Sequence, residues 1–202
     1  MRIGIKITFF LLSAMAVLST AQALAQLAQP AATPAQPRAD LALDYTYMRS
    51  NAPPGDCGCF NLNGGSATFG WHIGQSHFAL VGDVSVAEAG KISSNGYGLT
   101  LSTFTAGARY QFRLAHSPLH PFGQILAGAA HGSGSLVDGQ NPSVSNSGGT
   151  FAGIAGGGID LHLNHRLSIR LVEADYLATT FNNGDNDHQN NLRLSAGVVF
   201  HF

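Results

Sequence analysis

The residues of this chain that could carry covalent chemistry are few and lie in segments rich in glycine and serine. His131 and Ser133 are separated by one residue, so a strand would place both side chains on the same face. A histidine can act as general base for a neighbouring serine nucleophile when an acid orients its imidazole. Gly-Ser runs are also ordinary loop material, and we therefore expect no catalytic residue.

Two further pairs have residue types that bind metals. Cys57 and Cys59 flank a single glycine, which gives half of a zinc site without a second pair of ligands. Two ligands alone do not predict a metal site. A disulfide across one residue is strained, but an oxidising compartment favours it, so a disulfide between Cys57 and Cys59 and two free thiols stay open as alternatives. His116 and His120 would share a face on a helix, but Pro118 argues against a helix, and we interpret both as turn residues. We expect no metal and no cofactor.

Charged residues recur at every second position of several segments and form a third candidate site. If these segments are strands, the charged side chains point to one side of the sheet. Buried charges must pair, so we expect a polar network, with an ion path and a plug of side chains as the two alternatives. The predicted network contains Asp44, Asp83, Arg109, Arg113, Asp160, His162, Arg170, Glu173 and Arg193, with His72, His77, Asp175 and His201 beside them.

Strands must position these residues, and the alternation of side chains predicts eight of them. In the last strand, apolar residues at even positions from Leu192 to Phe202 alternate with mostly small or polar residues from Arg193 to His201. The predicted strands span residues 40–49, 65–74, 77–87, 99–113, 121–131, 150–163, 166–177 and 191–202.

Three places do not follow the simple alternation. Leu99 and Leu101 have the wrong parity for their strand, which predicts either a bulge near Thr103 or a strand end that stands clear of the bilayer. Strict alternation would also place Glu173 and Asp175 in lipid, so we predict a bulge at residues 171–172. The register of strand 121–131 is ambiguous, and we place Phe122 with the outward aromatic residues.

The outward faces of these strands fit a membrane rather than water. Charged residues make up 10% of the chain and hydrophobic residues 45%, yet no apolar run beyond the first 20 residues has the length of a membrane helix. Outward aromatic residues fall into two belts, one near each end of the strands, as bilayer interfaces favour. Short connections at one end and long Gly-, Asn- and Ser-rich connections at the other are typical of outer-membrane barrels.

The N-terminal residues predict export. Arg2 and Lys6 precede an apolar run, and Ala23 and Ala25 form a small-x-small cleavage pattern, so we assign residues 1–25 to a signal peptide, with cleavage after Ala23 as the alternative. Residues 26–38 are rich in Ala, Gln and Pro and predict a flexible leader, and residues 39–202 form the barrel. Removal of Arg2 and Lys6 from the 10 basic residues leaves 8 against 11 acidic residues, which argues against a nucleic-acid partner.

The terminal Phe202, the alternation and the loop asymmetry together resemble the OmpA-like family of small outer-membrane barrels, the outer membrane protein β-barrel domain. The resemblance implies an all-β fold, an eight-stranded antiparallel up-and-down transmembrane barrel in the bacterial outer membrane. It implies the lipid bilayer and the barrel assembly machinery as partners, with Phe200 and Phe202 as the assembly signal. We expect a monomer, with outer loops available to an extracellular ligand.

The leading functional hypothesis is a non-enzymatic barrel with a filled interior and a structural or surface-interaction role. One alternative is a lipid-modifying enzyme, since lipid A deacylases are similar eight-stranded barrels with a His-x-Ser arrangement; here the Asn that follows the serine in those enzymes is replaced by Gly134. Others are a small gated pore and a soluble lipocalin-like barrel. The last would carry its apolar face inside, whereas here arginine and aspartate alternate with the aromatic face.

Overall fold

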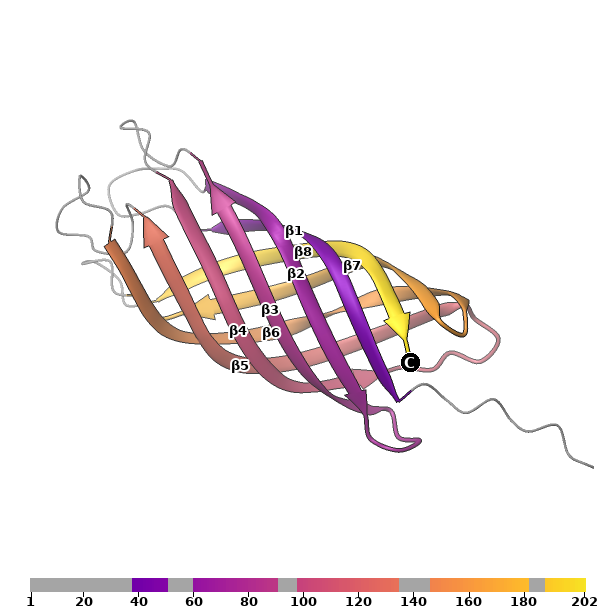
Figure 1. Ribbon diagram of the computed structural model, residues 1–202. Coiled ribbons are helices and arrows are strands. Elements are labelled where there is room, and N and C mark those ends of the chain that lie inside the picture. The colour runs from indigo at the N-terminus through magenta and orange to yellow at the C-terminus, as the bar shows by residue number, and fades with distance from the viewer. Residues whose placement is uncertain (1–37, 51–59, 91–97, 135–145, 182–187) are drawn as a thin grey trace, which may run out of the picture. The chain divides into compact units, whose positions relative to one another are not determined.

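The alternating residues form long antiparallel strands in the computed structural model (Figure 1). The structure describes residues 38–50, 60–90, 98–134, 146–181 and 188–202. Within these ranges there are eight strands, namely β1 (Ala39–Ser50), β2 (Phe60–His72), β3 (Phe78–Ala89), β4 (Leu99–Gln111), β5 (Leu119–Gly134), β6 (Asn146–Asn164), β7 (Leu167–Thr179) and β8 (Gln189–His201). The described residues contain no helix that is long and apolar enough to cross a membrane.

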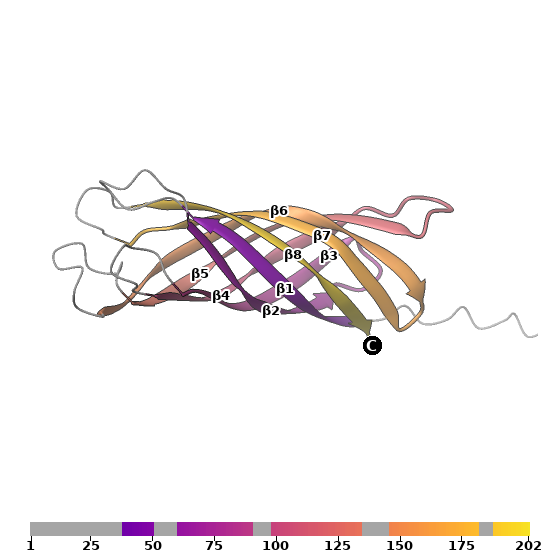
Figure 2. The same cartoon turned by 90° about the horizontal axis from the view of Figure 1, so that it is seen from above.

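The sheet closes on itself because the first and last strands pair. Each strand is antiparallel to its neighbour in sequence, and β8 pairs with β1 from Asn191 opposite Ser50 to His201 opposite Asp40 (Figure 2). The seam continues to the terminus, where the Phe202 amide donates to the Ala39 carbonyl oxygen at 2.9 Å. Closure leaves no edge strand in the sheet, as a hydrocarbon environment demands. The predicted eight-stranded antiparallel barrel is confirmed.

The two ends of the barrel differ in the length of their connections. At the end where β1 begins and β8 ends, here called the inner end, the strands are joined by residues 73–77, 112–118 and 165–166 (Figure 1). At the other end, the outer end, the connections span 51–59, 90–98, 135–145 and 180–188. Short periplasmic turns and long extracellular loops are the rule for outer-membrane barrels, so the inner end faces the periplasm.

Apolar side chains cover the outside of the barrel wall, while the inside buries most of the charged residues that the structure describes. Large exposed hydrophobic residues occur on every strand. They include Leu43, Trp71, Leu80, Phe104, Ile125, Phe151, Leu171, Leu192 and Phe200. This arrangement is the reverse of a soluble barrel, so the lipocalin-like alternative is wrong.

A β-bulge in β7 corrects the parity of its acidic residues. Arg170 pairs with Asp160 and Val172 with Ile159, which leaves Leu171 as an extra residue, and the pairing with β8 shifts over the same stretch. Leu171 and Val172 are consequently both exposed on the lipid side, while Glu173 and Asp175 are buried inside. The bulge predicted at residues 171–172 is confirmed, and it spares two carboxylates from contact with hydrocarbon.

Of the two alternatives for Leu99 and Leu101, the bulge near Thr103 is absent. The pairing of β4 runs without a shift from Leu99 to Gln111 against β5, and over the same residues against β3 up to Tyr110. Leu101 is therefore buried inside the barrel. That alternative is wrong because it assumed a polar interior along the whole strand, whereas Leu101 belongs to a buried apolar cluster.

Candidate functional site

The interior of the barrel holds a layer of charged side chains that lies nearer the inner end. Three arginines and six carboxylates are buried there, and each is at most 7% exposed. The inward positions of the strands supply them, and the β7 bulge delivers Glu173 and Asp175 to the same layer. The buried charged residues are Asp40, Asp44, Asp83, Arg109, Asp160, Arg170, Glu173, Asp175 and Arg193. We call this set the polar network.

Arg193 of β8 connects carboxylates of β3 and β7 across the interior. Its Nη1 donates to Asp83 Oδ1 at 2.7 Å, and its Nη2 donates to Asp175 Oδ2 at 2.7 Å and to Glu173 Oε1 at 3.3 Å. Asp83 also accepts a hydrogen bond from the Thr68 hydroxyl at 3.0 Å. The side chain of Arg193 is fully buried, so its charge depends on these partners.

Arg170 of β7 makes a second set of ion pairs. Its Nε and Nη2 donate to the two oxygens of Asp160, at 2.9 and 3.3 Å. Its Nη1 donates to Glu173 Oε2 at 2.7 Å and to Asp44 Oδ2 at 3.2 Å. Because Glu173 contacts both Arg170 and Arg193, the two sets form one continuous network that spans the barrel.

Arg109 of β4 joins the network through an uncharged residue. Its Nε and Nη2 donate to Gln124 Oε1 at 3.1 and 2.8 Å, and Gln124 Nε2 donates to Glu173 at 3.1 Å and to Asp175 at 3.2 Å. Gln124 was not predicted as a site residue. Its parity within β5 is the signal that could have identified it, but the ambiguous register of that strand concealed it.

Phe122 lies inside the barrel, and its predicted outward orientation is wrong. It is 4% exposed, and the guanidinium carbons of Arg109 and Arg170 lie 4.3 and 4.8 Å from its ring centroid. An aromatic ring attracts a cation over its face, so Phe122 fills the interior while adding a favourable contact to two buried arginines. It shares the inward parity of Gln124 on β5.

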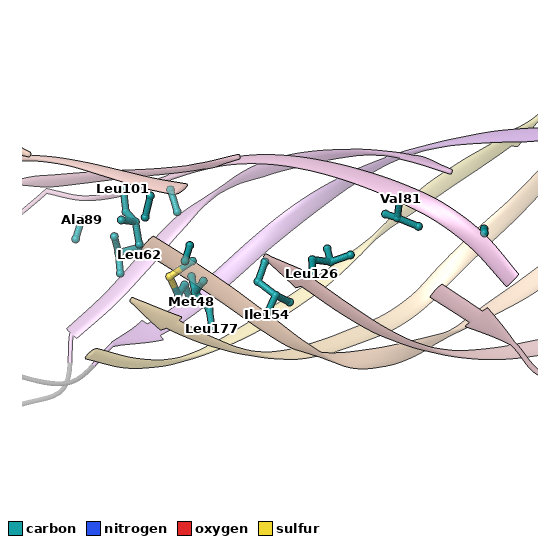
Figure 3. Packing of buried hydrophobic residues seen from close by; sticks show 12 residues of the cluster. Met48, Leu62, Val81, Ala89, Leu101, Leu126, Ile154 and Leu177 are labelled. Carbon is teal, nitrogen blue, oxygen red and sulfur yellow. The ribbon is translucent and has the colours of Figure 1, made fainter. Parts of the chain in front are cut away.

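The interior near the outer end is largely apolar, although Ser50, Thr179 and Asn191 are also buried there. The side chains that pack together there include Met48, Leu62, Leu101, Ile154 and Leu177 (Figure 3). The partly buried Phe60, Leu99 and Phe181 lie against this cluster. Each of these five buried side chains comes from a different strand, namely β1, β2, β4, β6 and β7. We call Met48, Leu62, Leu101, Ile154 and Leu177 the apolar plug. It leaves the interior filled by two successive layers, ion pairs toward the inner end and hydrocarbon toward the outer end.

Histidines gather at the inner mouth of the barrel. The imidazole of His162 stacks on His120 and on His201, with ring centroids 4.4 and 4.7 Å apart. The Ser168 hydroxyl lies between two of them, 3.0 Å from His162 Nδ1 and 2.7 Å from His201 Nε2. His120 therefore belongs to β5 and to this stack, so its interpretation as a turn residue was wrong, whereas His116 does lie in the turn.

His72 lies at the same end and contacts a carboxylate. Its Nε2 is 2.7 Å from Asp40 Oδ2, and Asp40 Oδ1 lies 4.0 Å from Arg109 Nη1. Asp40 was not predicted as a site residue, although it shares the inward parity of Asp44 on β1. It links the histidines of the inner mouth to the polar network.

Two residues predicted for the interior lie elsewhere. Arg113 is exposed two residues beyond the end of β4, and His77 is exposed just before β3, with its ring 5.6 Å from that of Tyr110. Both predictions extended the alternation past the true end of a strand. Cys57 and Cys59 lie outside the described residues. Phe200 and Phe202 face outward at the inner end.

The contacts that the structure shows in this interior are ion pairs and hydrogen bonds between side chains. In the ranges that the structure describes, no group of three or more His, Cys, Asp or Glu side chains is arranged to hold a metal ion. His131 is exposed on the outer wall, and among the described residues the histidine that pairs with a carboxylate is His72. The pair of His131 and Ser133 therefore lacks the orienting acid of a triad within the described part of the chain.

Comparison with known proteins agrees with this architecture. The sequence matches the model of the outer membrane protein beta-barrel domain over residues 10–200. A search of curated proteins finds no match to the sequence.

Solved structures with a similar fold include two bacterial surface proteins. The barrel is similar to Neisserial surface protein A, with a TM-score of 0.60 and 16% identity over 81% of this chain and 97% of that chain. It is also similar to Ail, the attachment invasion locus protein of Yersinia pestis, with a TM-score of 0.55 and 17% identity over 82% of this chain and 99% of that chain. Identities at this level show a shared fold. Together with the match over residues 10–200, they show that this chain belongs to the family of outer membrane protein β-barrel domains and is an integral protein of the bacterial outer membrane.

Proposed function

We propose that this protein is a sealed, non-enzymatic barrel that stabilises the outer membrane and presents its outer connections to molecules outside the cell. The observation that carries the proposal is the double filling of the interior. The polar network spans the barrel with three arginines that are at most 1% exposed, and the apolar plug lies beyond it toward the outer end. A barrel of eight strands has an interior just wide enough for side chains to fill it.

A pore is the less supported alternative. An ion that crosses the barrel would have to break the pairs of Arg170 or Arg193 and then pass the closely packed side chains of Met48, Leu62, Leu101 and Leu177. Both steps oppose conduction, because buried charges without partners and ions in hydrocarbon are strongly unfavourable.

Electrical recording tests the sealed interior. We expect the purified barrel, inserted into planar lipid bilayers, to give no stable conductance above that of the bare membrane. A general porin inserted into the same membranes serves as the positive control. A change in gel mobility between unboiled and boiled samples confirms that the inserted protein was folded. Reproducible open levels at all voltages would contradict the proposal.

A lipid-modifying activity has less support than a non-enzymatic role. His131 and Ser133 lie on the outward face near the outer end, where a lipid substrate would approach, but no carboxylate contacts His131 within the described residues. We expect mass spectrometry of lipid A from cells that express the protein to show an unchanged number of acyl chains. Loss of an acyl chain with the wild type, but not with Ser133→Ala, would establish the enzymatic alternative.

The outer connections support a surface role. At this end they are each nine to eleven residues long, whereas an inner connection is as short as residues 165–166. Ail, which shares this fold, is named for attachment and has also been solved in complex with the heparin analogue sucrose octasulfate, with a TM-score of 0.52 to this barrel. The same arrangement of loops on a rigid wall would serve contacts with extracellular ligands here.

A further inference from the structure

The outward wall near the outer end carries three tyrosines, each bonded to an asparagine on the next strand. The hydroxyl of Tyr45 donates to Asn63 Oδ1 at 2.7 Å, and that of Tyr47 to Asn61 Oδ1 at 2.8 Å. On the other side of the seam, the hydroxyl of Tyr176 donates to Asn190 Oδ1 at 2.5 Å. These pairs join β1 to β2 and β7 to β8, and because β8 pairs with β1 they occupy four neighbouring strands. We call these six residues and Arg49 the tyrosine–asparagine sector.

The side chains of this sector are available to a ligand. Tyr45 and Tyr176 are 60% and 51% exposed, and Asn61, Asn63 and Arg49 are also exposed. Each asparagine uses its carbonyl oxygen to accept from a tyrosine, so in this arrangement its Nδ2 amino group, with two donors, is directed away from that bond. Arg49 Nη1 donates to Asn61 Oδ1 at 3.0 Å, which holds the guanidinium beside the amides.

The sector lies at the boundary between the apolar and the polar parts of the wall. On β1 the outward residues pass from Leu43 to Tyr45, Tyr47 and then Arg49 toward the outer end, and on β8 they pass from Leu194 and Leu192 to Asn190. This is the level at which the hydrocarbon of the outer leaflet gives way to its headgroups.

The neighbouring strands β3 and β4 differ in chemistry at this level. Glu88 of β3, which pairs in register with Asn63, is exposed and carries a negative charge beside the edge of the sector. On β4 the outward residues are Thr100 and Ser102, and neither carries a charge or a ring. The four strands of the sector therefore present a guanidinium, amide donors and tyrosine hydroxyls, whereas β3 and β4 present a carboxylate and two hydroxyl side chains at the same level.

From this geometry we propose that the tyrosine–asparagine sector binds the sugar–phosphate headgroup of a glycolipid of the outer leaflet, which in the outer membrane is lipopolysaccharide. Amide groups donate to sugar hydroxyls and phosphate oxygens, and the guanidinium of Arg49 pairs with a phosphate. Exposed tyrosine rings pack against the apolar faces of sugar rings. Glu88 repels phosphate, which limits the headgroup to the four strands of the sector.

Titration with lipopolysaccharide tests the site. The full-length barrel in detergent micelles is titrated with purified lipopolysaccharide. Native mass spectrometry measures the fraction of barrels that keep a bound lipopolysaccharide. We expect the combined variant Arg49→Gln, Asn61→Ala and Asn190→Ala to need at least about fivefold more lipopolysaccharide for half-saturation, a difference of roughly 1 kcal/mol. The matched control, Thr100→Ala with Ser102→Ala on β4, should bind as the wild type does.

Two results would overturn the proposal. One is equal binding of lipopolysaccharide by the wild type and the combined variant, with heat-modifiable mobility showing that both are folded. The other is equal competition by phosphatidylglycerol, which would make the sector a general surface for anionic lipids. Should the variant fail to fold, a photoreactive amino acid placed at position 61 of the otherwise wild-type barrel must crosslink to lipopolysaccharide in cells, whereas one at position 100 must not.

Discussion

Replacing Arg193 with methionine should destabilise the folded barrel by about 3–5 kcal/mol, the usual cost of removing one partner from a buried ion pair. Methionine keeps much of the length of the side chain, so the lost packing is small. What is lost is the cation that Asp83, Glu173 and Asp175 share. The measurement is the urea midpoint of unfolding for the barrel in lipid vesicles. The folded fraction at each urea concentration is read from the difference in gel mobility between unboiled and boiled samples.

Two comparisons show whether charge is the cause. Arg166→Met removes an exposed arginine from an inner turn and should leave the midpoint unchanged. Adding Asp83→Asn and Asp175→Asn to Arg193→Met removes two of the unpaired negative charges and should recover much of the lost stability. If Arg193→Met unfolds at the same urea concentration as the wild type, the polar network does not hold the barrel together.

Replacing Gly197 with valine should also be severe, because it adds a side chain where two strands leave no room for one. A Cβ atom at Gly197 would lie 2.1 Å from the Leu43 carbonyl oxygen and 2.5 Å from Asp44 Oδ1. The carbonyl belongs to the seam between β8 and β1, so relief of the clash would separate the strands that close the barrel. We expect a loss of about 3 kcal/mol, the upper part of the usual range for overpacking, in the same urea assay.

Gly82→Val provides the matched control for this substitution. Gly82 is also a strand glycine, on β3, but a Cβ atom there would meet nothing within 4 Å and would face lipid. Because valine favours strands and hydrocarbon, Gly82→Val should fold with at least the wild-type midpoint. Equal losses for the two variants would mean that the clash at the seam is not the cause.

The outward face of the sheet could be predicted from the sequence because its environment, lipid, is uniform. Lipid accepts only apolar side chains, so the alternation in β8 was sufficient to predict which of its side chains face outward. In β7, strict alternation would place two carboxylates in lipid, which was sufficient to predict a bulge. The register of β7 followed because Glu173 and Asp175 at strict parity would face hydrocarbon, and a single extra residue removes that cost.

The interior could be predicted only in part because it contains two environments. Near the outer end it is largely apolar, as the wall is, so the hydrophobic character of Leu99 and Leu101 did not indicate the side they face. Phe122 was misplaced for the same reason, since an inward aromatic between two arginines has the same residue type as a lipid-facing one. Gln124 was missed because a search for alternating charges omits an uncharged residue that bridges them. Asp40 was missed because it is the first residue of the predicted strand 40–49.

Fluorescence of the single tryptophan tests most directly which side of the sheet faces lipid. Trp71 is the one tryptophan of the chain, lies on β2 near the inner end, and is 50% exposed on the outward face. For the barrel folded into vesicles, we predict strong quenching of Trp71 by lipids that are brominated on the acyl chain near the headgroup, and weak quenching by acrylamide in the aqueous phase. Strong quenching by acrylamide without quenching by the brominated lipids would contradict the account, because the aromatic face would then lie in water or inside the barrel.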